Sequence, residues 1–163
     1  MTRPSLIVFQ DAASMVDGPK VWLRTLLYST AKRGNVIEGM FVRLRRDNVR
    51  QTFSFWGCGE RNELVRGSGL YVDQSGVALN HHFSLSGDSY RFEFAPGDYV
   101  VEIFALLVGR RGPLPLTQIA LHLTEEHAKA LKNVEDMIHF DLTPESGGYA
   151  AYVRRRPERL ASG

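Results

Sequence analysis

Short apolar runs, broken at close intervals by Gly, Pro, Asn, Asp and Ser, constrain the fold of this chain more than any other feature of its sequence. Breaks spaced roughly 8–12 residues apart are typical of a β-sandwich or a β-barrel. Residues 52–56 alternate strictly, which predicts a strand with Phe53 and Phe55 on one side. The sequence therefore predicts an all-β protein built as an antiparallel β-sandwich.

About ten strands are expected. They cover residues 6–9, 21–28, 36–44, 52–56, 70–72, 77–85, 99–108, 114–123, 137–142 and 149–153. The run 99–108 is apolar on both faces except for Glu102, which predicts a central strand covered on both sides. The runs 70–72 and 77–85, separated by a turn, are expected to form a hairpin.

One short helix is expected over residues 124–133. Thr124 is suited to the position before its first turn, because a threonine hydroxyl accepts a hydrogen bond from a backbone N–H there. Glu125 and Glu126 follow, and carboxylates near a helix N-terminus are stabilised by the helix dipole.

The length of 163 residues predicts a single domain with a core of its own. A composition of 44% hydrophobic and 23% charged residues is that of a globular protein. We expect residues 1–153 to form one sandwich domain, and residues 154–163 to form a basic, disordered tail.

One segment, from Phe94 to Ile103, resembles the turn-into-strand segment of immunoglobulin-like sandwich modules, in which a Pro-Gly-x-Tyr-x-Val pattern recurs. The resemblance implies that Tyr99 enters a central strand and that its hydroxyl closes the corner. The chain is longer than one such module and carries a helix before its last strands, so a jelly-roll-like sandwich remains the alternative.

The charge and the cysteine content limit the classes of partner and compartment. A formal net charge of +2 gives no reason to expect a nucleic acid or a membrane as partner. The single cysteine, Cys58, excludes a disulfide within the chain, and we expect a cytoplasmic protein. No apolar run is long enough for a membrane-spanning helix.

The stretch Asn80-His81-His82 is the part of the sequence most suggestive of chemistry. In a strand the two histidines point to opposite faces, so one metal ion cannot easily bind both. We take Trp56, Asn80, His81 and His82 as candidate residues for binding a small ligand. A cupin-like metal-dependent enzyme built on His81 or His82 is the less favoured alternative.

Four arginines form a second candidate surface. Arg43 and Arg45 share one face of a strand, while Arg110 and Arg111 lie in a loop. Together they are candidates for binding an anion or an acidic partner. The alternative, which we favour, is a solvated face that protects a strand edge from aggregation.

No motif of a known enzyme class is complete, so we assign no catalytic residue, no metal ligand and no cofactor. The preferred hypothesis is a non-catalytic sandwich that binds a protein partner or itself through a sheet edge or loops. A sandwich that binds a small molecule or a carbohydrate is the main alternative. Cys58 could serve as a nucleophile only with a histidine base beside it.

Overall fold

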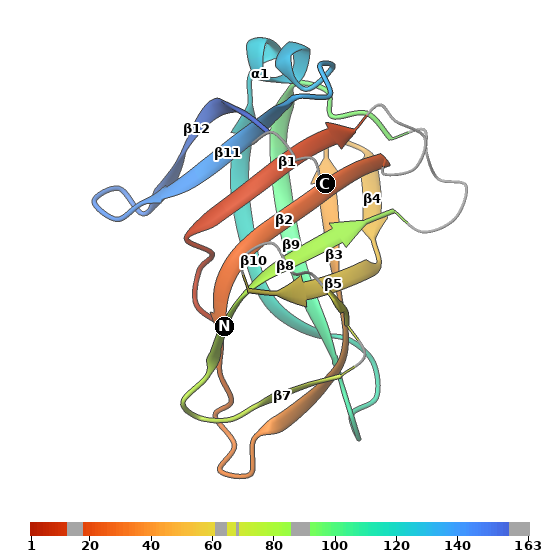
Figure 1. Cartoon of the computed structure of the whole chain (residues 1–163), viewed down its shortest axis with the longest axis vertical. Coiled ribbons are helices and arrows are strands. Elements are labelled where there is room, and N and C mark those ends of the chain that lie inside the picture. The colour runs from red at the N-terminus through yellow and green to blue at the C-terminus, as the bar shows by residue number, and fades with distance from the viewer. Residues whose placement is uncertain (13–17, 61–64, 68, 86–91, 157–163) are drawn as a thin grey trace, which may run out of the picture.

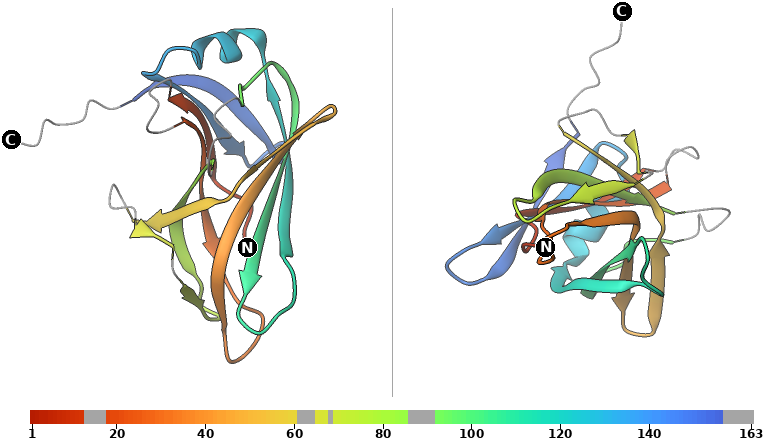
Figure 2. Two further views of the ribbon diagram at one scale, coloured as in Figure 1. Left: turned by 90° about the vertical axis from the view of Figure 1, so that its right-hand side faces the viewer. Right: turned by 90° about the horizontal axis from the view of Figure 1, so that it is seen from below.

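The computed structural model describes residues 1–12, 18–60, 65–67, 69–85 and 92–156. The strands form two antiparallel sheets that face each other across one apolar core (Figures 1 and 2). The predicted all-β sandwich is confirmed.

The larger sheet has seven strands. In spatial order they are β12 (Gly148–Arg155), β11 (Asp136–Thr143), β1 (Leu6–Ala12), β2 (Gly18–Leu27), β8 (Val77–Ser84), β5 (Phe55–Gly59) and β6 (Val65–Arg66). The smaller sheet has five. It runs in the order β10 (Leu114–Leu123), β9 (Gly97–Leu107), β3 (Asn35–Arg46) and β4 (Val49–Phe53), and β7 (Leu70–Val72) pairs with the start of β3.

The core forms because alternate residues of the long strands are apolar and point between the sheets. In β9, for example, Tyr99, Val101 and Ile103 are fully or almost fully buried. The prediction of a central strand is confirmed, since β9 pairs with both β3 and β10. The prediction that both of its faces are covered is wrong, because Leu106 on the outer face is 37% exposed.

The chain crosses from one sheet to the other at Ser54. β4 ends at Phe53 and pairs with β3, whereas β5 begins at Phe55 and pairs with β8 in the other sheet. The crossing reverses which residues point inward, so Phe53 is fully buried and Phe55 is 42% exposed. The prediction of one strand over 52–56, with both phenylalanines on one side, is therefore wrong.

The expected hairpin of 70–72 and 77–85 is also wrong. The turn between the two runs is present, because the Asp73 carboxylate accepts hydrogen bonds from the backbone N–H groups of Ser75 and Gly76. The strands on either side of it diverge, however. β7 pairs with β3 in the smaller sheet, and β8 lies between β2 and β5 in the larger one.

The single helix of the described chain, α1 (Glu125–Ala130), is confirmed. The Thr124 hydroxyl accepts a hydrogen bond from the backbone N–H of His127, 3.1 Å away, as a capping threonine should. The helix lies at one end of the sandwich beside β11, where Ala128 and Leu131 are buried (Figure 1). None of the helical residues that the structure describes forms a segment able to span a membrane.

Two further expectations concern the corner before β9 and the C-terminal tail. The Tyr99 hydroxyl donates a hydrogen bond to the backbone carbonyl of Ala95 over 2.6 Å, so the expected closure of the corner is present. β12 continues to Arg155, inside the segment expected as a tail. Residues 157–163 of that tail lie outside the described residues.

Candidate binding site

Two cavities adjoin each other where β5 and β6 meet the edge of β3. Phe55 and Arg66 line both of them and form the ridge between them, and the guanidinium carbon of Arg66 lies 4.6 Å from the centre of the Phe55 ring. Guanidinium groups are attracted to aromatic faces in this arrangement, which fixes the charge at the ridge. Among the described residues, Arg66 makes no ion pair with a carboxylate.

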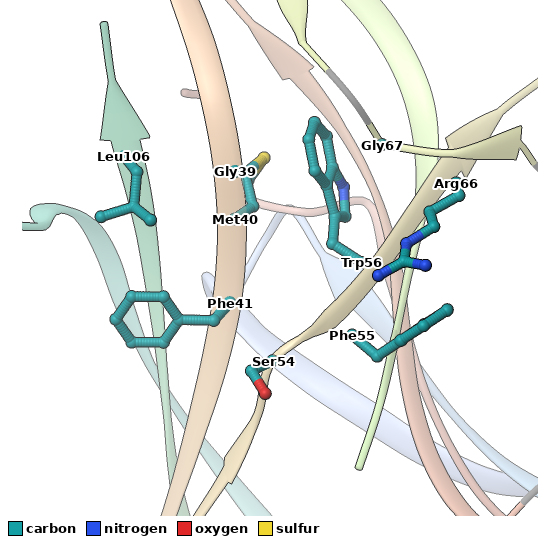
Figure 3. A pocket seen from close by; sticks show the side chains of 9 residues that line it. All are labelled: Gly39, Met40, Phe41, Ser54, Phe55, Trp56, Arg66, Gly67 and Leu106. Carbon is teal, nitrogen blue, oxygen red and sulfur yellow. The ribbon is translucent and has the colours of Figure 1, made fainter. Parts of the chain in front are cut away.

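The first cavity, which we call the β3 cleft, has a volume of about 300 Å³. Figure 3 shows its lining, which consists of Gly39, Met40, Phe41, Ser54, Phe55, Trp56, Arg66, Gly67 and Leu106. Most of these side chains are apolar, and Arg66 supplies a positive charge. A mostly apolar cavity with one charged group is the usual composition of a binding site.

The β3 cleft exists because the edge of β3 is only partly paired. β4 pairs with residues 42–46 of β3, and β7 pairs with residues 35–37. Between them, the described part of the chain places no strand beside residues 38–41 on this edge, while β9 pairs with the opposite edge. An unpaired strand edge presents backbone N–H and C=O groups to any segment that lies along it.

Trp56 forms the wall of the β3 cleft nearest the core. Its indole N–H donates a hydrogen bond of 3.1 Å to Nδ1 of His81, and the two rings are stacked. Gly67 lies against the other side of the indole, where an added Cβ would come within 2.1 Å of Cε3 of Trp56. The position therefore requires a glycine, and the tryptophan is held firmly between β6 and β8.

His81 is fully buried on the inner face of β8. Burial, and to a smaller extent the nearby His82, lowers the pKa of His81 to about 4, so the imidazole is neutral at pH 7. Because Nδ1 accepts from Trp56, the proton of the neutral ring resides on Nε2. In the described structure Nε2 has no hydrogen-bond partner.

Cys58 lies on β5 directly opposite His81 in the strand register. Burial raises the pKa of the Cys58 thiol, which keeps it protonated at neutral pH. A nucleophilic cysteine needs the opposite shift and a histidine base that accepts its proton. The Nδ1 of His81 is occupied by Trp56, and the arrangement does not activate the thiol.

The second cavity, which we call the Gly57 slot, has a volume of about 200 Å³ and lies on the outer face of the larger sheet. His82, Gly57 and Arg66 form one row across β8, β5 and β6. The His82 ring stacks against Trp22 of β2, with ring centres 5.5 Å apart. Burial, followed by the charge of Lys20, lowers the pKa of His82 to about 4.

The four residues proposed from the sequence as ligand-binding divide between two faces. Trp56 and His81 are buried on the inner face, whereas Asn80 and His82 lie on the outer face, as expected for neighbours in a strand. Asn80 accepts a hydrogen bond of 3.1 Å from Arg24 across β8 and β2. Binding by any of the four remains a prediction.

The four arginines do not form one surface. Arg43 and Arg45 lie beside Glu102 of β9, with the closest pair of atoms 3.3 Å apart at Arg45. Arg110 and Arg111 are in the loop after β9, roughly 20 Å further along that strand. The structure thus separates the two pairs and gives the first pair an internal partner, and binding of an anion or an acidic partner by either pair remains a prediction.

Sequence reasoning missed Phe55, Arg66 and the glycines of the two cavities. The exposure of Phe55 depends on the crossing at Ser54, which no local pattern signals. Among the described residues, no three His, Cys, Asp or Glu side chains are grouped so that they could hold a metal ion. Comparison with models of known protein families, with curated proteins and with solved structures finds no match for this chain.

Proposed function

We propose that this chain is a non-catalytic binding module that takes up a short, extended segment of a protein partner in the β3 cleft. The observation that carries the proposal is the edge at residues 38–41 of β3, beside which the described residues place no strand and which adjoins a cavity of about 300 Å³. A peptide in extended conformation gains backbone hydrogen bonds when it adds a strand to such an edge.

The length of the unpaired edge limits the partner. Residues 38–41 offer about 13 Å of strand, enough for roughly four residues of an added peptide. β4 and β7 close the edge at its two ends, so the long edge strand of a second folded copy fits poorly. A flexible segment is therefore favoured over self-association.

The lining of the β3 cleft indicates the composition of the segment. Trp56 offers apolar surface on the inner side of β3, whereas Phe41 and Leu106 offer it on the outer side, so successive side chains of the peptide meet the two surfaces in turn. The guanidinium of Arg66, which makes no ion pair with any carboxylate that the structure describes, favours an acidic side chain or a terminal carboxylate beside them. We propose a short acidic-apolar peptide as the class of ligand.

We also propose a relationship to immunoglobulin-like sandwiches and a cytoplasmic location, both of which the sequence indicates. A relationship to immunoglobulin-like sandwiches is supported by the hydrogen bond between Tyr99 and Ala95. A cytoplasmic location is suggested by the presence of a single cysteine.

A library of random octapeptides displayed on phage tests the proposal. We expect the wild-type protein to select acidic-apolar sequences, and a synthetic copy of the best one to bind in fluorescence anisotropy. Gly39→Val should weaken this binding at least tenfold, because the side chain enters the β3 cleft. Within the part of the chain that the structure describes, an added Cβ at Gly39 meets only Cδ1 of Leu106, at 3.6 Å, so the variant should fold.

The matched control is Gly57→Val, which lies outside the β3 cleft and should leave peptide binding unchanged. Peptides that bind Gly39→Val as tightly as wild type would overturn the proposal. If light scattering shows that the wild-type protein is a dimer and that Gly39→Val is a monomer, the occupant of the β3 cleft is a second copy of the chain and the peptide proposal is wrong.

A further inference from the structure

The outer face of the larger sheet has one gap in an otherwise filled row of side chains. Along this row β2 contributes Trp22, β8 contributes His82 and β6 contributes Arg66, while β5, between the last two, contributes Gly57. The Gly57 slot is the space left above that glycine.

The glycine at position 57 is not explained by the needs of the fold. The structure gives it no left-handed backbone conformation, and of the described residues an added Cβ would meet only the backbone of Val65, at 3.4 Å from its carbonyl oxygen. Gly67 contrasts with it, since a Cβ there would collide with Trp56. Gly57 contributes no side chain to the space between its cross-strand neighbours His82 and Arg66.

The dimensions of the slot match one flat ring. Neighbouring strands are about 4.8 Å apart, so His82 and Arg66, which lie on either side of β5, are roughly 10 Å apart at the backbone. One planar ring that contacts both walls at about 3.5–4.0 Å needs about 7–8 Å, so this spacing holds one ring and is too narrow for two stacked rings. One wall is the face of the His82 ring opposite Trp22, and the other is the guanidinium of Arg66, held by Phe55.

The charges around the slot favour an anion. Lys20 and Arg66 both line it, and Ser84 adds a hydroxyl group. None of the seven lining residues that the structure describes is acidic. The neutral His82 ring offers an aromatic face, and the two cations can bind a carboxylate or a phosphate.

We propose that the Gly57 slot binds a small planar aromatic ring that carries an anionic group, and that the ring stacks between His82 and Arg66. The ligand continues the stack that Trp22 and His82 begin, and Lys20 holds its anionic group. This site adjoins the β3 cleft and shares Phe55 and Arg66 with it, but Gly57, Lys20 and His82 line the slot alone, so the proposal does not rest on peptide binding.

Calorimetric titration with four compounds tests the proposal. Adenosine monophosphate and nicotinate each carry a ring and an anion, while adenosine and nicotinamide carry the ring alone. We expect at least one of the two anions to bind with Kd below about 1 mM, and its neutral counterpart to bind at least tenfold more weakly. Binding of adenosine monophosphate would indicate a nucleotide as the ligand, whereas binding of nicotinate would indicate an aromatic acid.

Variants locate the binding. Gly57→Val should weaken binding at least tenfold by filling the floor of the slot, whereas Gly39→Val, in the β3 cleft, should leave it unchanged. Lys20→Gln should weaken the binding of the anionic compound and leave that of its neutral counterpart unchanged. It replaces Gly57→Val as the test if that variant does not fold. Failure of all four compounds to bind, or binding that Gly57→Val and Lys20→Gln both leave unchanged, overturns the proposal. In the peptide assay the two variants exchange roles, with Gly39→Val as the test and Gly57→Val as the control. Ring binding and peptide binding can therefore fail independently of each other.

Discussion

The indole N–H of Trp56 donates a hydrogen bond of 3.1 Å to Nδ1 of His81 within the core of the sandwich. Trp56 is on β5 and His81 is on β8, so the bond joins two paired strands. Through it, the wall of the β3 cleft is anchored to the interior. The bond is therefore expected to stabilise both the fold and the shape of the cleft.

A double-mutant cycle should measure this bond. His81→Leu leaves the buried indole N–H without an acceptor and should cost about 2 kcal/mol of unfolding free energy. In the Trp56→Phe background the same change should cost about 1 kcal/mol less, because the donor is gone. Chemical denaturation of the four proteins gives the coupling. Losses that simply add would contradict the assignment of the bond.

The sequence predicted those features that local signals determine. The cap at Thr124 and the corner at Tyr99 each depend on atoms within a few residues, and both are present. The crossing at Ser54 and the separation of β7 from β8 depend instead on which distant strands pair. Both cavities result from that pairing, so neither could be found from alternation or spacing.

Gly67→Ala should destabilise the protein by about 1–3 kcal/mol, because the added Cβ would overlap the Trp56 ring and push β6 away from it. Thermal unfolding followed by tryptophan fluorescence measures the loss. Gly39→Ala is the matched control, since the nearest atom to its Cβ is 3.6 Å away. Equal melting temperatures for the two variants would show that the indole does not need this glycine.

Tyr99→Phe should lower the unfolding free energy by about 1 kcal/mol, because it leaves the carbonyl of Ala95 without its 2.6 Å hydrogen bond. Tyr71→Phe removes a comparable bond, from an exposed hydroxyl to the carbonyl of Arg33, and should cost much less since water replaces it. Urea denaturation compares the two variants. A larger loss for Tyr71→Phe would contradict a structural role for the corner.

Acid should destabilise the fold through His81 and His82. Their pKa values are lowered to about 4 in the folded protein, mainly by burial, against 6.5 for an unperturbed histidine. Between these values the unfolded chain binds more protons, so the unfolding free energy falls as the pH drops through this range.

His81→Gln removes one of the two groups, while its amide oxygen can still accept from Trp56. We expect its loss of stability between about pH 7 and about pH 4.5 to be smaller than that of wild type, by on the order of 2 kcal/mol. Because acidic residues titrate alike in both proteins, the difference isolates His81. Parallel pH profiles would mean that burial does not hold His81 neutral, and they would contradict the hydrogen bond from Trp56, which needs an unprotonated Nδ1 as its acceptor.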